Sequence, residues 1–279
     1  MDTGTMTRRN AYIQDIARQL SKFLETGRAE DLIACLVAES NLPGPRPNHD
    51  LARAFADTVR EYAAADEEDR QVLWNLCVEL ACVSPEDAPT DDPHEFLSFC
   101  GVCGIAAIGS VASAFTEIAL AQLQEASLDP RWRVREAVAL GVRELLAARP
   151  EETVAELEGW VESGSWLPMR AAAAGIAGSD LMAEPDLAEV ALRLHRKILV
   201  RVYTATERQS EAFLALRKAL GYTLSRVVAA LPGIGFEYLR QLATLDDRDV
   251  RWIIRENLER DGLRRQYPET VQHIRAQLS

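Results

Sequence analysis

The sequence predicts an all-α fold in which short helix hairpins are stacked into an array, and three observations support it. Apolar residues recur at helical spacing in nearly every segment, and no segment shows the sustained alternation of a strand. Prolines and glycines separate the helices by short connections, which make consecutive helices antiparallel. A similar block of residues recurs in the second half of the chain, as in repeat proteins.

The first helices are predicted from apolar stripes that end at proline or glycine. The segment 32–37 forms a short helix, which the proline-rich segment 41–47 ends because proline cannot continue a helix. Two further helices are predicted over 49–65 and 68–83. The opening helix is indicated by apolar residues three and four positions apart, namely Ile13, Ile16, Ala17, Leu20 and Leu24.

Residues 84–93 are the predicted internal boundary, because they contain three prolines and four acidic residues. We therefore expect an N-terminal helical region over 1–83, which is either a cap or a set of degenerate repeats. A linker over 84–93 and a repeat array over 94–279 follow it. Short hairpins are expected throughout the array, because its breakers are closely spaced.

The repeated block consists of an Asp, an aliphatic residue followed by Arg, and then small and apolar residues. Its copies contain Val134-Arg135, Met169-Arg170 and Val250-Arg251. The arginines are 35 and 81 residues apart, and because 81 is about twice 40, a degenerate unit is expected near residues 184–221. A two-helix unit of about 35–40 residues is the repeat length of helical solenoids.

This block resembles the HEAT-repeat family, whose second helix commonly opens with an Asp and has Val-Arg about six residues later. Asp129 and Arg135 match that spacing, Asp246 and Arg251 are one residue short of it, and the copy at Arg170 lacks the Asp. The resemblance covers about residues 112–262. It implies a right-handed α-solenoid of antiparallel hairpins whose second helices line a concave face. It also implies that the Asp and Arg are structural, with the Arg bonding to backbone and Asp of the neighbouring repeat.

The two halves of the chain differ in charge. Residues 1–130 contain 9 Lys and Arg against 22 Asp and Glu, whereas residues 131–279 contain 22 against 21. An acidic surface repels phosphate backbones, so the net acidity disfavours DNA as a partner and places any binding site in the second half. Five cysteines without a disulfide framework, no signal peptide and no apolar span of about eighteen residues predict a cytoplasmic protein without a membrane partner.

Arginines and tryptophans of the second half are the predicted binding residues. An Arg- and Trp-lined concave face could hold a protein or peptide, or bind phosphates and stack on a base. The latter arrangement is similar to the HEAT-like alkylpurine DNA glycosylases, which need a carboxylate among their aromatic residues. No motif fixes such a carboxylate here, because Asp129, Asp247 and Asp249 lie at cap or turn positions where Asp is ordinary. The predicted binding residues are Arg131, Trp132, Arg135, Arg170, Arg248, Arg251, Trp252 and Arg255.

Other motifs favour structural roles. The five-residue spacing of Cys77 and Cys82 on a helix points their thiols in diverging directions, so these cysteines and the Cys100–Cys103 pair are expected to pack in the core rather than to bind zinc. The segment 231–235 resembles a DNA-binding hairpin, but Glu237 would repel a phosphate, which favours a turn between repeats.

His195 is expected at a partly exposed surface position, and the sequence contains no familiar catalytic signature. The sequence therefore predicts a non-catalytic HEAT-repeat scaffold that binds a protein or peptide on its concave face. It assigns no catalytic residue, metal or cofactor. A DNA-binding protein related to the alkylpurine glycosylases is the alternative.

Overall fold

The structure is a computed structural model that describes residues 3–278, with side chains from residue 8 onward. Its regular secondary structure within that range is entirely helical, which confirms the predicted all-α class. Within the same range, no helix combines the length and the apolarity that are needed to cross a membrane. The chain divides into two compact units, unit 1 (Met1–Thr153) and unit 2 (Val154–Ser279), and each is built of helix pairs like a segment of an α-solenoid.

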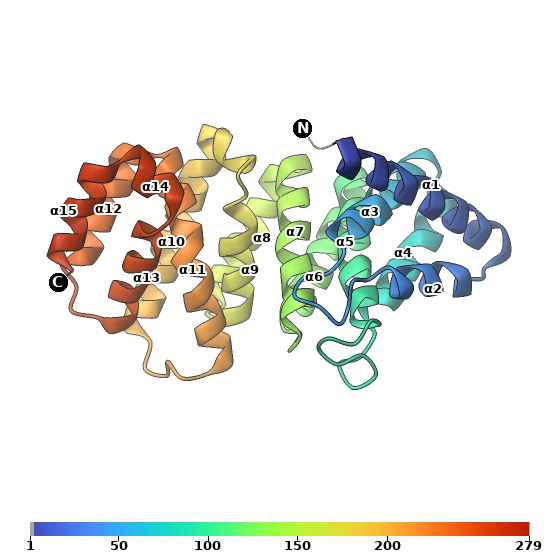
Figure 1. Ribbon diagram of the computed structural model, residues 1–279, viewed down its shortest axis with the longest axis horizontal. Helices are drawn as coiled ribbons and strands as arrows, with labels where there is room; N and C mark the ends of the chain where they lie inside the picture. Colours follow the sequence, from blue (N-terminus) through green and yellow to red (C-terminus); the bar gives the residue numbers. More distant parts are fainter. Residues whose placement is uncertain (1–2, 279) are drawn as a thin grey trace. The chain divides into compact units, whose positions relative to one another are not determined.

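Unit 1 is organised around a helix that is buried on nearly all sides. This helix, α5, packs against α3, α4, α6 and α7 (Figure 1). A Cβ atom on Gly101 would lie 2.3 Å from the backbone nitrogen of Ala81, so glycine is required where α5 crosses α4. The helices of this unit are α1 (Thr3–Thr26), α2 (Glu30–Ala38), α3 (His49–Ala65), α4 (Glu67–Ala81), α5 (Glu95–Val111), α6 (Ser113–Ala126) and α7 (Trp132–Ala148).

Helix starts in unit 1 follow from local sequence. The side chain of Asn48 accepts a hydrogen bond from the backbone of Leu51, and Asp66 accepts two at the start of α4. These caps place α3 and α4 within two residues of the predicted helices 49–65 and 68–83.

The segment 84–93 lies inside unit 1 and does not coincide with the boundary between the compact units. Two buried arginines at the start of α7 hold it. Arg131 donates hydrogen bonds to the carbonyl oxygens of Val83 and Ala88, and Arg133 forms an ion pair with Asp91. Because α5 then packs on α3 and α4, this proline-rich segment is a fixed loop of unit 1 rather than a linker between units.

Unit 2 has two layers of helices. Helices α9, α11 and α13 lie side by side, and α10 contacts all three from one side (Figure 1). Helix α12 contacts α11 and α13. The elements are α8 (Pro150–Glu162), which begins in unit 1, α9 (Trp166–Ile176), the 3-10 turn η1 (Leu181–Ala183), α10 (Pro185–Thr204), α11 (Glu211–Ala230), α12 (Pro232–Ala243), α13 (Arg248–Leu258), α14 (Asp261–Gln266) and α15 (Pro268–Gln277).

The segment 184–221, where a degenerate repeat is predicted, contains α10 and the first half of α11. Both helices are 20 residues long, which accounts for the long step between Arg170 and Arg251. Ser210 rather than Asp caps α11. At the other end of α11, Pro232 begins α12 after the single residue Leu231, which confirms the predicted turn between helices.

His195 is fully buried, so its prediction as a partly exposed residue is wrong. Its Nδ1 lies 2.7 Å from the carbonyl oxygen of Ala191, and its Nε2 lies 2.9 Å from the hydroxyl of Thr223 on α11. The side of α10 that carries His195 packs against α11, and burial lowers the pKa of the imidazole to about 4. His195 is therefore a neutral residue that fastens two helices.

The cysteines divide between core and surface. Cys77 and Cys100 are buried, as predicted, and burial raises the pKa of both thiols. Cys82 is exposed at the C-cap of α4, so the expectation of core packing is wrong for this residue. Among the described residues, no three His, Cys, Asp or Glu side chains form a group that could hold a metal ion.

Candidate binding surface

One side of the α9, α11 and α13 layer is exposed, and its residues follow helical spacing. On α11, Leu214, Lys218 and Tyr222 are four residues apart and are exposed or half-buried, whereas most other positions of this helix are buried. Since α10 contacts the three helices from the other side, these exposed residues face away from it. We define the α9–α11–α13 face by Leu167, Arg170, Leu214, Lys218, Tyr222, Arg248, Trp252 and Arg255.

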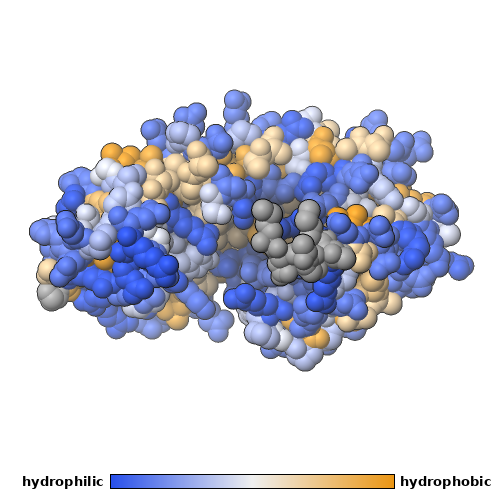
Figure 2. All heavy atoms as spheres, turned by 45° about the horizontal axis from the view of Figure 1, so that its top comes forward, coloured by the Kyte–Doolittle hydropathy of each residue, from blue (hydrophilic) through white to orange (hydrophobic). Residues whose placement is uncertain are grey.

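Large apolar residues are seldom exposed in unit 2. Figure 2 shows hydrophilic residues over most of the visible surface, with apolar residues in scattered patches. Leu214 is 42% exposed on the α9–α11–α13 face. Val200 and Tyr203, at the end of α10, and Ile234, on α12, are the other exposed large apolar side chains that the structure describes in unit 2.

Trp252 is seated in a fixed position on this face. The guanidinium carbon of Arg217 lies 4.2 Å from the centroid of its ring, within the range of a cation–π contact. A Cβ atom on Gly221 would lie 3.1 Å from the same ring, so the glycine leaves room for the indole on α11. The ring therefore bridges α11 and α13 and remains half-exposed.

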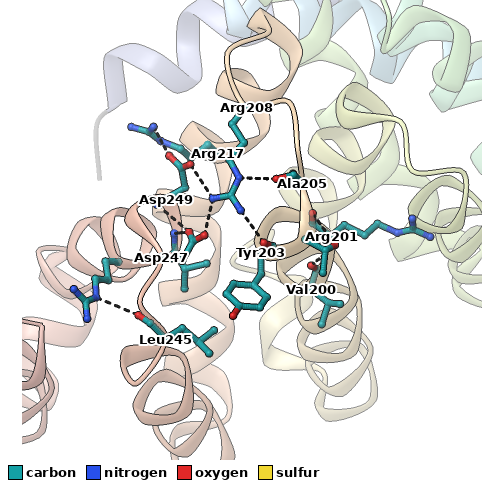
Figure 3. Close-up of polar contacts among 12 residues, drawn as sticks. Val200, Arg201, Tyr203, Ala205, Arg208, Arg217, Leu245, Asp247 and Asp249 are labelled. Carbon is teal, nitrogen blue, oxygen red and sulfur yellow. Dashed lines mark hydrogen bonds and ion pairs between the residues drawn. The ribbon is translucent and has the colours of Figure 1, made fainter.

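An ion-pair network holds Arg217, the residue that contacts the ring of Trp252. Asp249, which is 4% exposed, accepts from Arg217 at 2.7 Å and from Arg208 at 3.3 Å (Figure 3). Arg208 also donates to Asp247 at 2.6 Å. Burial raises the pKa of Asp247, but the backbone N–H of Val250 and the Arg208 guanidinium outweigh it and hold the pKa below its usual range. The start of α13 is thus fixed to α11 and to the loop that precedes α11.

The other arginines of α13 contact the chain itself. Arg251 donates to the carbonyl oxygen of Leu245 at 3.1 Å and pairs with Asp246 at 3.2 Å. Arg255 donates to the carbonyl oxygen of Leu278 at 2.7 Å. Both of these partners of Arg251 lie in its own repeat, whereas the HEAT resemblance implies a contact with the neighbouring repeat.

Two cations of unit 2 have no partner among the residues that the structure describes. The side chains of Lys218 and Arg248 are exposed and form no ion pair, hydrogen bond or ring contact with any described residue of the chain. Every other Lys and Arg of unit 2, including Arg170, has such a contact. Both unpaired cations lie on the α9–α11–α13 face.

The predicted binding residues of α7 lie in unit 1 and make internal contacts. Arg131 is 1% exposed, and its guanidinium also bonds to the carboxylate of Asp129. Arg135 donates to the carbonyl oxygens of Asp129 and Pro130. Trp132 is 40% exposed, with the Arg133 guanidinium carbon 4.4 Å from its ring centroid. The structure therefore groups Arg170, Arg248, Trp252 and Arg255 on one face, and separates them from Arg131, Trp132 and Arg135 by unit.

The sequence did not single out Leu214, Lys218 or Tyr222, because they belong to no motif. Their spacing of four residues along one side of this helix is the signal that could have identified them.

A shallow open depression lies near the end of α10, with a volume of about 410 Å³. Arg201 is the one arginine among the described residues that line it. This residue of α10 donates to the carbonyl oxygen of Glu162 at the end of α8, at a distance of 2.8 Å, and so ties α10 to the end of α8. Tyr203, which is exposed beside it, accepts a hydrogen bond from Arg208 through its carbonyl (Figure 3). These contacts fix the loop between α10 and α11.

Comparisons with known proteins identify neither a family nor a partner for this chain. No family model matches the chain, and no curated protein matches it. A designed armadillo repeat protein is 15% identical, with 81% of this chain and 98% of the design covered and a TM-score of 0.29. Two engineered proteins solved by a structural genomics consortium are also 15% identical, with TM-scores of 0.32 and 0.28.

The match to the first of these engineered proteins covers 87% of this chain and 97% of that protein. The match to the second covers 100% of this chain and 85% of that protein. None of these likenesses says what this chain binds. The helical-repeat architecture rests on the helix pairs of the chain itself.

Proposed function

We propose that this protein is a non-catalytic HEAT-type scaffold whose α9–α11–α13 face binds an extended segment of a protein partner. The observation that carries the proposal is the combination on this face of an exposed Leu214, a Trp252 ring seated on α11, and two cations that contact no other described side chain or carbonyl. Aromatic and aliphatic side chains on a rigid surface are typical anchors of peptide recognition.

The HEAT assignment is supported by contacts between successive helices of the layer. Asp247 caps α13 by accepting hydrogen bonds from the backbone of Asp249 and Val250. Arg217, one helix earlier, bonds to Asp249. This Arg-to-Asp contact between repeats has the form that the HEAT resemblance implies, although it uses Arg217 instead of Arg251.

The carboxylates near Trp252 favour binding over catalysis. Asp247 and Asp249 are both engaged by Arg208, and Asp249 also by Arg217, which holds both carboxylates in place. Such carboxylates suit a structural role, and this argues against the glycosylase alternative, which needs an available carboxylate among its aromatic residues.

Selection of peptides from a random display library on the full-length protein tests the proposal. Enriched peptides are then measured against Leu214→Arg, which places a long charged side chain on the face. The matched control is Val72→Arg, because Val72 is 40% exposed, similar to Leu214, but lies on α4 of unit 1.

We expect affinity for the selected peptides to fall about tenfold or more in Leu214→Arg, the loss that removal of one apolar anchor typically causes, and to stay unchanged in Val72→Arg. Equal affinity for the two variants, with both folded by circular dichroism, would show that the peptides bind elsewhere and would overturn the proposal. Failure to enrich any peptide would have the same consequence.

A further inference from the structure

We infer that the segment bound on the α9–α11–α13 face is acidic, with at least two carboxylates flanking an apolar or aromatic side chain. This inference rests on the proposed function and specifies its partner. It follows from which Lys and Arg side chains of unit 2 form ion pairs within the chain and which do not.

Pairing within the chain is the rule for the cations of unit 2. The exposed residues Arg193, Lys197 and Arg240 pair with Glu158, Glu162 and Glu237, at distances from 2.8 to 3.2 Å. Unit 2 contains 17 Lys and Arg and 17 Asp and Glu, so its charges balance overall. Against this background, the two cations that have no partner in the described part of the chain are exceptions, and both lie on the same face.

The acidic residues at the start of α13 are already occupied. Asp249 is buried between Arg208 and Arg217, and Asp246 pairs with Arg251. Lys218 on α11 and Arg248 on α13 form no ion pair with any residue that the structure describes. A ligand carboxylate would pair with each of them without displacing a contact within the chain.

Apolar surface accompanies the two cations. Leu214 and Tyr222 are the residues four positions before and after Lys218 on α11. Trp252 is four residues after Arg248 on α13. Each cation is therefore next to a large apolar side chain, as suits a peptide whose acidic residues flank an apolar or aromatic one.

The same features fit a peptide better than a nucleic acid. Tight binding to duplex DNA generally involves about six to ten phosphate contacts, and unit 2, with no net charge, offers two unpaired cations. The whole chain has a net charge of −12, which opposes the approach of a polyanion. A short segment with a few carboxylates needs no more cations than this face provides.

Fluorescence anisotropy with labelled peptides and the full-length protein tests the inference. Three probes of equal length share one Trp and one Leu and differ in their charged positions, which are all Glu, all Gln or all Lys. A labelled DNA duplex and a labelled single strand are measured in parallel. Each titration is made at about 50 mM and about 200 mM salt, because screening weakens contacts between exposed charges.

The variant Lys218→Glu/Arg248→Glu reverses both unpaired charges without removing a contact of the fold. Its matched control is Arg193→Glu/Lys197→Glu, which makes the same change of charge on α10. The melting temperature of each variant shows that it is folded.

We expect the Glu peptide to bind more tightly than the Gln and Lys peptides, with affinity that falls as salt rises. We expect about a tenfold loss in the Lys218→Glu/Arg248→Glu variant and a change of less than about twofold in the control, since tenfold corresponds to about 1.4 kcal/mol shared by two exposed pairs.

Equal affinity for the Glu and Gln peptides would overturn the acidic preference and leave the proposed peptide-binding function intact. Tighter binding of DNA than of the Glu peptide, lost in the same variant, would assign this face to nucleic acid and overturn the inference. If the probes do not bind but library peptides do and are rich in Lys and Arg, the inference fails alone. If library selection also yields nothing, the proposed function fails with it.

Discussion

The starts of α7 in unit 1 and α13 in unit 2 have similar sequences, with several arginines and one tryptophan, but their side chains have different environments. In α7, Arg133 is 2% exposed and reaches α5 and the loop before it. In α13, Arg248 is exposed and unpaired, and Arg251 lies at the surface of its own repeat. Unit 1 thus uses these arginines to fix a loop, and unit 2 leaves one available.

The difference shows that an Arg-rich helix start does not identify a binding surface by itself. Unit 1 contains 26 Asp and Glu against 14 Lys and Arg, so its arginines have many possible partners. Unit 2 has equal numbers, and two of its cations remain without a partner in the described chain. Three substitutions test this difference between the two units.

The largest effect is expected in unit 1. Glu95 is fully buried and accepts from Arg133 at 3.1 Å, and burial already raises its pKa despite the nearby arginines. Arg133→Met would leave this carboxylate without its partner, and loss of one member of a buried ion pair costs about 3–5 kcal/mol. We expect the free energy of unfolding of unit 1 to fall by this amount, measured by hydrogen exchange of α5 and α7 amides.

The double variant Arg133→Met/Glu95→Met provides the control, because it removes both charges. We expect it to recover most of the stability that the single variant loses. A loss below about 1 kcal/mol in Arg133→Met would show that the two units use their arginines in the same way.

A second effect is expected in unit 2, where His195 is buried as deeply as Glu95 but is neutral. Its pKa of about 4 in the folded state lies below the ordinary 6.5, so the unfolded chain binds a proton that the folded chain excludes. Its contribution to stability is complete above pH 6.5 and falls as the pH drops from 6.5 to about 4, by on the order of 3 kcal/mol.

The measurement is hydrogen exchange of α10 and α11 amides at pH 7 and pH 4.5, in the wild type and in His195→Gln. The variant cannot titrate at this position, so we expect it to lose less stability on acidification than the wild type. Equal losses in the two proteins would show that His195 does not sense pH in the fold.

The smallest effect is expected from Arg251→Glu. This side chain is 34% exposed and makes one hydrogen bond to a carbonyl oxygen and one surface ion pair. Loss of such contacts should reduce stability by about 1 kcal/mol and lower the melting temperature by a few degrees. Arg265→Glu is the control, because Arg265 is 76% exposed and pairs only with an exposed carboxylate. An unchanged melting temperature in Arg251→Glu would show that this residue is a free surface arginine.

Helices and their ends were predictable because their causes are local. Proline at position 232 and the caps Asn48 and Asp66 act within one helical turn of their own position. The burial of His195 was not predictable in the same way, since it depends on Thr223, which is 28 residues further along the chain. The fixed conformation of residues 84–93 likewise depends on arginines more than forty residues later.

The amino-acid sequence is enough to predict the all-helical class, the positions at which helices end, and the contrast between an acidic first half and a near-neutral second half. Which arginines are available depends on the packing of the chain, because an arginine is engaged only where an acceptor distant in the sequence comes within hydrogen-bond distance. Arg131 and Arg133 meet such acceptors in unit 1. Lys218 and Arg248 meet none among the described residues, and this distinguishes the surface that we propose for binding.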